Sequence, residues 1–142
     1  MYSALDLAKY IVNYCYKKYK PVSNLKLQKM LYFIWVDYYK NNCVKLFNEK
    51  FYAWQFGPVV TETYYEFCSY AGVEICKTYD VNLANEDLLE INQLIEKYID
   101  TPVRKLVEMT HKENGPWDMV YNKGAGPKKE IPFDVIIRLE VA

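Results

Sequence analysis

The first part of the chain carries apolar side chains at every third or fourth position, with polar residues between them. This is the spacing of an amphipathic helix with one buried face. Ser3 is suited to cap the helix at its start, and Pro21 cannot continue it. The pattern therefore predicts a helix over residues 3–19, and its apolar stripe consists of Leu5, Ala8, Val12, Cys15 and Tyr19.

The next segment is apolar nearly all the way round a helix. Ser23 is suited to cap this second helix, which is predicted over residues 24–40 and is expected to be central and buried. Gln28 and Lys29 interrupt its apolar pattern. A lysine in such a helix must extend to solvent, pair with a carboxylate or face a cleft. The sequence leaves two interpretations of Lys29 open: a salt bridge to the acidic middle of the chain, and a polar contact in a partner or ligand cleft.

An aromatic run over residues 51–56 is typical of a short strand, and the Gly57-Pro58 turn after it is expected to end that strand. A third helix is predicted to begin at about residue 60 and to end at Gly72. Residues 73–77 alternate between polar and apolar side chains. We therefore expect them to pair with the first strand as a small ribbon.

Three further helices are predicted, beginning near Asn85, Thr101 and Pro132, and a loop rich in Gly, Pro and Lys over residues 123–129 precedes the last one. Acidic residues follow Asn85 and a proline follows Thr101, as is common at helix starts. The sequence thus predicts a mainly α (α+β) single domain, residues 1–142. Its expected architecture is a compact bundle of about five to six helices with a small two-stranded β element.

Composition agrees with one small domain, because 51% of the 142 residues are hydrophobic. Asp6 and Lys9 interrupt the apolar run that a signal peptide needs, and no run approaches the roughly 18 apolar residues of a membrane span. We therefore expect a cytoplasmic protein. The four cysteines include no CxxC pair, so neither a zinc site, a disulfide framework nor any cofactor is predicted. Cys15 and Cys68 are interpreted as small core residues.

The net charge is zero, but its distribution is uneven. Residues 1–50 hold nine lysines and three acidic residues, whereas residues 51–100 hold two lysines and nine acidic residues. Helix faces that pack beside each other explain this pattern, and so does a basic face that docks an acidic partner. General nucleic-acid binders carry a net basic charge, so a nucleic-acid partner is not expected.

The sequence contains no recognisable catalytic constellation. His111 is the only histidine, and nothing places a nucleophile beside it. A histidine at the end of a helix more often interacts with the last carbonyls and the helix dipole. The five glycines form no phosphate-binding motif. We therefore predict no catalytic residue and no enzyme activity.

Three blocks of the sequence resemble the Panacea-domain family, which is also called the SocA-like or phage-associated GepA group. They are the LQKMLY run within residues 24–33, the AWQFGPVV run at residues 53–60 with Tyr64 after it, and the THKE run at residues 110–113 with Pro116 and Trp117 after it. The blocks follow one another in the family's order and, with the segments around them, span about residues 3 to 121. One block alone would be a weak match, whereas three in order are a strong one.

The resemblance implies a compact helical domain of bacteria and their phages, many of whose members act as antitoxins beside unrelated small toxins. It implies that the partner is a cognate toxin encoded next door and neutralised by direct binding. Delivery of the toxin to a protease is a further option. The blocks are expected to form a shared cleft, for recognition or for support of the domain. It comprises Gln28, Lys29, Tyr32, Trp54, Gly57, Pro58, Tyr64, His111, Glu113, Pro116 and Trp117.

Two other functions stay open at this point. A cleft that holds Lys29, His111 and two tryptophans suits an anionic aromatic ligand, which favours a small-molecule or nucleotide-binding domain with a cryptic activity. The basic first third of the chain favours a DNA-binding regulator. Zero net charge and the lack of a clear helix-turn-helix argue against the regulator.

Overall fold

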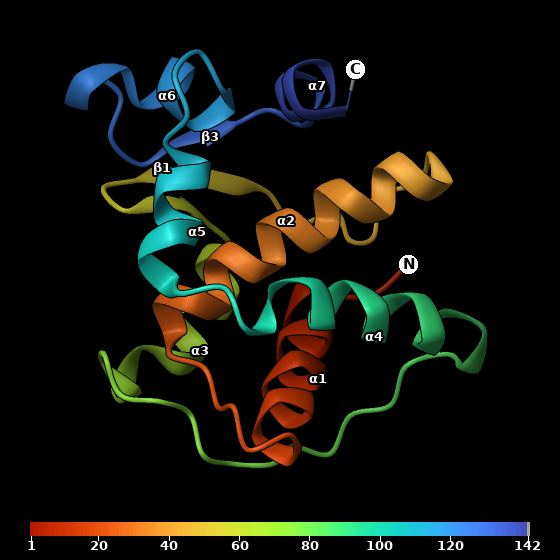
Figure 1. The fold of residues 1–142 in the computed structure, drawn as a ribbon. Helices are drawn as coiled ribbons and strands as arrows, with labels where there is room; N and C mark the ends of the chain where they lie inside the picture. Colours follow the sequence, from red (N-terminus) through yellow and green to blue (C-terminus); the bar gives the residue numbers. More distant parts are fainter. Residues whose placement is uncertain (142) are drawn as a thin grey trace.

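The computed structural model describes residues 1–141 (Figure 1). Its helices are α1 (Ala4–Lys17), α2 (Asn24–Asn42), α3 (Thr61–Phe67), α4 (Asn85–Ile99), α5 (Val103–Thr110), α6 (Pro116–Tyr121) and α7 (Phe133–Ile136). Its strands are β1 (Phe51–Trp54), β2 (Gly57–Val59) and β3 (Lys129–Ile131). Short 3₁₀ turns follow α3 and α6, and a π-helical turn, Ile137–Val141, follows α7. The predicted class, mainly α with a small β element, is confirmed.

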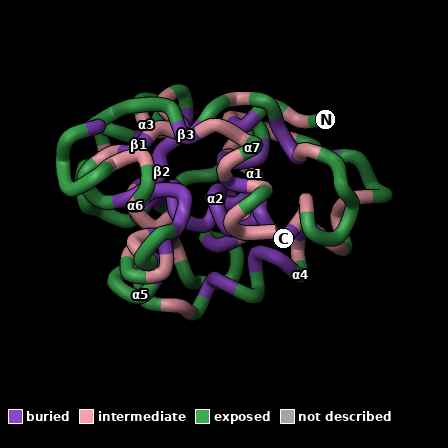
Figure 2. The backbone as a smooth tube through the Cα atoms, turned by 90° about the horizontal axis from the view of Figure 1, so that it is seen from above, coloured by how far each residue is buried: buried purple, intermediate pink, exposed green. Residues whose placement is uncertain are grey.

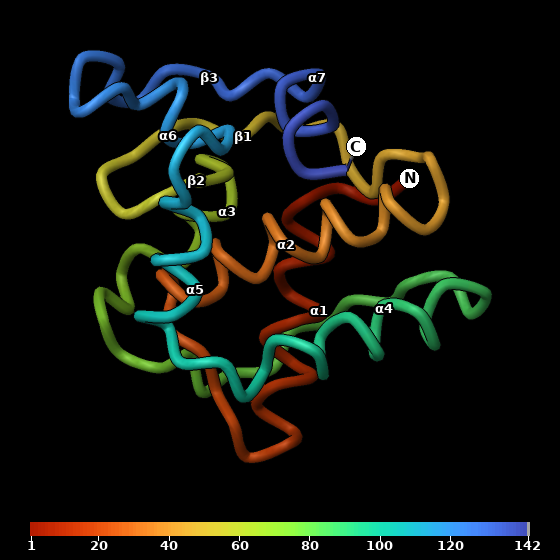
Figure 3. Tube along the Cα trace, turned by 45° about the horizontal axis from the view of Figure 1, so that its top comes forward, coloured from red at the N-terminus to blue at the C-terminus, as the bar shows by residue number. Residues whose placement is uncertain are grey.

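Helix α2 lies at the centre of the molecule. It contacts α1, α3, α4, α5, β2 and the C-terminal π turn. Helices α1 and α4 lie on one side of it, and the sheet with α6 and α7 lies on the other (Figures 1 and 3). Every residue from 27 to 37 is buried, as the purple path through the middle of Figure 2 shows. The prediction of a central, buried second helix is confirmed.

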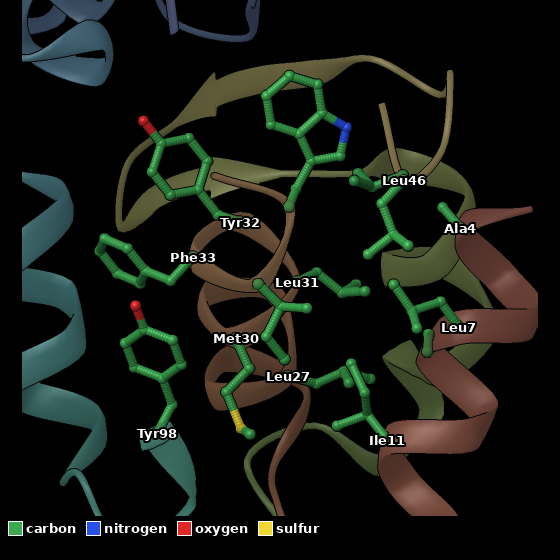
Figure 4. Close-up of a cluster of buried hydrophobic side chains, with 14 of the residues drawn as sticks. Ala4, Leu7, Ile11, Leu27, Met30, Leu31, Tyr32, Phe33, Leu46 and Tyr98 are labelled. Carbon is green, nitrogen blue, oxygen red and sulfur yellow. The ribbon is translucent and has the colours of Figure 1, made fainter. Parts of the chain in front are cut away.

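Large side chains fill the space on both sides of α2 (Figure 4). Leu27 and Leu31 point toward Leu7 and Ile11 of α1, and the Phe33 ring stacks on Tyr98 of α4 with centroids 5.5 Å apart. The fully buried Trp35 donates its indole N–H to the Phe47 carbonyl at 3.1 Å. Burying such side chains stabilises a fold by roughly 1.5 to 3 kcal/mol each. The position of α2 is therefore fixed from several sides.

The predicted starts of the first two helices are confirmed by their caps. The Ser3 hydroxyl accepts a hydrogen bond from the Asp6 amide at 3.0 Å, and the Ser23 hydroxyl accepts one from the Lys26 amide at 3.2 Å. These bonds satisfy amides that have no partner within the helix. Helix α3 begins at the predicted place but ends at Phe67, and the 3₁₀ turn Cys68–Tyr70 completes the segment.

The sheet is antiparallel, with the order β2-β1-β3, so it has three strands where two were predicted. The predicted pairing of residues 73–77 with the first strand is wrong. The turn residues Gly57 and Pro58 themselves form β2 with Val59, and β3 begins at Lys129, the last residue of the predicted loop, so both edges of β1 are occupied. Ile75 is buried instead beside the α1–α2 connection, where its amide bonds to the Val22 carbonyl at 2.8 Å. Helix α6 was also not predicted.

The uneven charges are partly explained by helix packing. Lys20, just after α1, pairs with Asp100 at the end of α4 at 2.7 Å, and Lys18 lies 3.9 Å from Glu96. The basic start of the chain therefore packs beside its acidic middle. Cys15 is buried as predicted, but Cys68 is exposed, because the helix ends before it and its 3₁₀ turn faces solvent. Within residues 1–141, no helix is both long and apolar enough to cross a membrane.

Candidate functional site

The three sequence blocks meet where α2 passes the β1–β2 hairpin and the α5–α6 connection. We call this group of side chains the motif cluster. It comprises Gln28, Lys29, Gly57, Pro58, Thr110, His111 and Trp117. The structure brings these residues together although they are separated by up to 89 positions in the chain.

Gln28 joins α2 to the start of α3. Its side-chain oxygen accepts hydrogen bonds from the Val60 amide and the Thr63 hydroxyl, each at 3.1 Å. Its amide nitrogen donates to Asn24, also at 3.1 Å. Val60 is the N-cap of α3 and has no side-chain cap of its own. A glutamine from another helix therefore satisfies a buried amide that would otherwise lack a partner.

Replacing Gln28 with methionine should lower the free energy of unfolding by about 2 kcal/mol, because it leaves the buried Val60 amide without an acceptor, while the Thr63 hydroxyl keeps its bond to the Val60 carbonyl. Chemical denaturation followed by circular dichroism measures the change. Gln93→Met provides the control, since Gln93 is exposed on α4, and it should change stability by less than about 0.5 kcal/mol. Equal stabilities of the two variants would contradict the anchoring role of Gln28.

Lys29 is fully buried, and its ammonium donates a hydrogen bond to the Pro58 carbonyl at 2.8 Å. No carboxylate within residues 1–141 lies within ion-pair distance of it, so the interpretation of Lys29 as a salt bridge to the acidic middle is wrong. Burial in an apolar environment lowers the pKa of Lys29 to about 7. The Pro58 carbonyl partly replaces a carboxylate as the partner of Lys29, and this hydrogen bond connects the β1–β2 hairpin to α2.

Gly57 passes close to this lysine. Its φ angle is +119°, a region that side chains disfavour, and a Cβ there would lie 2.7 Å from the Thr110 hydroxyl and 3.0 Å from the Lys29 ammonium. Only a glycine allows the hairpin, α2 and the end of α5 to approach this closely. Close packing of the Gly57 backbone against the Thr110 and Lys29 side chains therefore explains why a glycine precedes Pro58.

His111, Trp117 and Tyr121 form a stack of three rings. The His111 and Trp117 rings are 3.7 Å apart at their centroids, and those of Trp117 and Tyr121 are 4.5 Å apart. The Trp117 indole N–H donates to the Trp54 carbonyl at 2.8 Å, which joins the stack to β1. Burial and the nearby Lys29 ammonium lower the pKa of His111, against a hydrogen bond to the Phe56 backbone that raises it. The ring is therefore neutral at pH 7.

The remaining predicted site residues lie outside the motif cluster. Tyr32 packs in the core against Phe51, and its hydroxyl donates to Glu140 at 2.8 Å. Pro116 is buried as the first residue of α6. Glu113 is exposed in the loop before α6 and makes no hydrogen bond or ion pair within the described chain. Trp54 and Tyr64 lie beside the cluster, with ring centroids 4.8 Å apart.

A cavity of about 450 Å³ adjoins the motif cluster between the β1–β2 turn and the loop before β3. Sequence reasoning missed part of its lining, because Tyr121 and Lys128 lie in a helix and a loop that no periodic signal marked. Thr110 was also missed, although its block was recognised. The lining includes Lys29, Trp54, Phe56, Tyr64, Tyr121 and Lys128.

The cluster brings no nucleophile into contact with a base. The buried Nε2 atom of His111 has no hydrogen-bond partner among the described residues. Across residues 1–141, no group of three or more His, Cys, Asp or Glu side chains is placed to hold a metal ion. What the arrangement provides is a set of buried polar anchors that fix one hairpin, and a cavity with aromatic walls beside it.

Comparison with known proteins gives the chain a family. The family described as "Antitoxin SocA-like, Panacea domain" matches residues 27–118. The protein "Antitoxin SocA" of Caulobacter vibrioides (strain NA1000 / CB15N) is 32% identical over 120 residues, which cover 72% of this chain and 61% of that protein. The chain therefore spans about three fifths of the length of this relative. No solved structure matches significantly. The chain belongs to the SocA-like antitoxin family and carries its Panacea domain.

Proposed function

We propose that this chain is an antitoxin that neutralises a cognate toxin in the cytoplasm by direct binding, without catalysis. The observation that carries the proposal is the 32% identity to a protein named as an antitoxin, together with the family match over the three sequence blocks. The partner is a toxin encoded by a neighbouring gene. A protease that receives the toxin from this chain is a second proposed partner.

The buried residues of the motif cluster serve in this proposal to support the domain. Lys29 and Gln28 are fully enclosed, so a partner protein has no access to them. Their bonds to Pro58 and Val60 hold the β1–β2 hairpin and the start of α3 in place. The toxin would contact the surface that these anchors present, and the fixed shape of that surface lowers the entropic cost of binding.

An aromatic patch occupies that surface, at the β1–β2 turn and on α3. We define it as Trp54, Phe56, Tyr64 and Tyr65. Phe56 is 56% exposed and Tyr65 is 61% exposed. The Trp54 ring lies 6.2 Å from Tyr65, and Tyr64 lies 5.6 Å from Tyr65. Tyrosine and tryptophan are enriched among the residues that dominate binding energies at interfaces, which supports the patch as the toxin contact.

The test of the proposed function is co-expression with the product of the neighbouring gene. We expect that product to stop growth alone and to be tolerated when this chain is present, and the two proteins to co-purify in equal amounts. Growth arrest that persists despite stable expression of this chain would refute the antitoxin role. Measuring the toxin's half-life with and without this chain, in hosts that lack individual proteases, tests delivery to a protease.

Loss of the exposed patch should weaken toxin binding while the fold stays intact. We expect the double variant Phe56→Ser and Tyr65→Ser to bind toxin at least about tenfold more weakly, since aromatic anchors commonly contribute 2 kcal/mol or more. The double variant Val73→Ser and Leu89→Ser is the matched control, because both residues are exposed apolar side chains outside the patch. Calorimetry with purified toxin measures both. Equal affinities would exclude the patch as the contact.

A further inference from the structure

The cavity beside the motif cluster has the features of a binding site for a small ligand. Its volume of about 450 Å³ lies within the range of ligand pockets in proteins. The side chains around it come from α2, the β1–β2 turn, α3, α6 and the loop before β3. These elements are held together by the bonds of the motif cluster. The cavity is therefore formed by fixed parts of the fold, apart from the loop that closes one side.

The walls of this cavity are aromatic. Trp54 and Tyr64 contact each other with ring centroids 4.8 Å apart, and Phe56 lines the same space. Tyr121, the last ring of the stack with Trp117 and His111, also lines it. A flat ring that enters the cavity can continue this stack. Offset stacking of aromatic rings contributes about 0.5 to 1.5 kcal/mol beyond the burial of their area.

The charged lining is entirely positive. Lys29 and Lys128 line the cavity, and no aspartate or glutamate does. Lys29 is buried at the inner side, where its charge acts through a medium of low dielectric constant. The Lys128 ammonium lies 5.1 Å from the centroid of the Trp54 ring, at the exposed side. Below pH 7, where Lys29 holds its proton, an anion in the cavity is attracted from two sides, whereas at higher pH Lys128 supplies the positive charge.

Lys128 is held in a costly backbone conformation. Its φ angle is +61°, a left-handed value that side chains other than glycine and asparagine rarely adopt. A hydrogen bond from its amide to the Ala53 carbonyl of β1 maintains this conformation and keeps the side chain over Trp54. Such strained positions are concentrated where a protein contacts a ligand.

From the aromatic walls, the two lysines and the absence of acidic side chains in the lining, we infer that this cavity binds a small, planar, anionic ligand of the aromatic carboxylate type. The inference does not require the proposed antitoxin function, although Trp54, Phe56 and Tyr64 belong both to the aromatic patch and to the cavity. A free ligand is favoured over a segment of a partner because the aromatic walls and the positive charge converge on one concave space. The exposed Tyr65 ring, by contrast, does not line the cavity and lies on open surface.

The test is titration of ¹⁵N-labelled protein with 2-naphthoate and, separately, with its uncharged analogue 2-naphthamide, followed by NMR. We expect naphthoate to shift the signals of Trp54, Tyr64 and Tyr121 and to bind about tenfold more tightly than the amide, as expected for one nearby positive charge. Equal affinity for the two probes, or shifts elsewhere in the molecule only, would overturn the inference.

Two matched variants separate a defined site from general attraction to lysines. Lys123 and Lys128 lie in the same exposed loop and both have positive φ angles, but only Lys128 lines the cavity. Lys128→Gln should reduce the affinity for naphthoate about fivefold to tenfold, since it removes one charge near the anion. Lys123→Gln should leave the affinity unchanged. If both variants lose affinity equally, the probe binds to the basic loop and the inference fails.

Discussion

Gly57→Ala is expected to destabilise the protein by about 4 kcal/mol or more, which is large against the usual 5 to 15 kcal/mol for a domain. Two costs add up. The φ angle of +119° is strained for any residue with a Cβ, and the added carbon would lie 2.7 Å from the Thr110 hydroxyl. Relief of that contact requires the Thr110 hydroxyl or the Lys29 ammonium to leave its hydrogen bond to the Val107 or Pro58 carbonyl, or the backbone to move. Thermal and urea denaturation measure the loss.

Two other glycines separate the two costs. Gly124 has a φ angle of +92° but nothing near the position of its missing Cβ, so Gly124→Ala should show the backbone cost alone, about 1 to 2 kcal/mol. Gly72 has neither a positive φ angle nor a close neighbour, so Gly72→Ala should be neutral or slightly stabilising. A Gly57→Ala variant no less stable than Gly124→Ala would show that the close approach to Thr110 and Lys29 is not a constraint.

The sequence predicted elements well where burial and helical periodicity agree. Helix α2 was predicted because its apolar residues extend all round, and its N-cap was found because Ser23 precedes it. The errors occurred in short segments without periodicity. A strand of three residues such as β2 or β3 carries no alternation to detect, and it forms because β1 offers it an edge. Residues 73–77 alternate, but they lie beside the connection after α1, where the Ile75 amide bonds to the Val22 carbonyl, instead of pairing with a strand.

The candidate site was predicted as a set of residues, and its internal arrangement was not predictable. Gln28 and Lys29 are neighbours in sequence, yet each is satisfied by a different backbone group of the hairpin. The Val60 amide and the Pro58 carbonyl are backbone atoms, and the residue type of a position does not reveal such partners. The predicted salt bridge of Lys29 failed for the same reason. A charge pattern can indicate a pair of oppositely charged side chains, but it cannot indicate a backbone carbonyl such as that of Pro58 as the partner. Glu113, predicted in the site, remains exposed because the loop before α6 directs it outward.

A single physical requirement connects the three sequence blocks. A hairpin whose backbone packs on a buried helix must have its carbonyls and amides satisfied inside the protein. Lys29 supplies a donor to Pro58, Gln28 supplies an acceptor to Val60, and Trp117 supplies a donor to the carbonyl of Trp54. The residues of the three blocks therefore fix the position of the hairpin that carries the aromatic patch and lines the cavity. This role is the same whichever partner the patch or the cavity binds.

Lys29→Met should change the way in which stability depends on pH. Burial lowers the pKa of Lys29 to about 7 in the folded protein, from 10.5 in the unfolded chain. Between these values the unfolded chain holds a proton that the folded protein has released, so the free energy of unfolding rises with pH. From pH 7 to pH 9 this contribution amounts to about 2 kcal/mol in the wild type, and Lys29→Met lacks it.

The experiment is urea denaturation followed by circular dichroism at several pH values between 7 and 9. The free energy of unfolding of the wild type minus that of Lys29→Met should rise by about 2 kcal/mol from pH 7 to pH 9, because only the wild type gains from release of the proton. Groups that do not interact with Lys29 cancel in this difference, and His111, whose pKa Lys29 lowers, titrates mainly below this pH range. Lys40→Met, at an exposed position of the same helix, should keep the wild-type slope. Parallel curves for wild type and Lys29→Met would mean that Lys29 stays protonated in the folded protein, held by more than the Pro58 carbonyl.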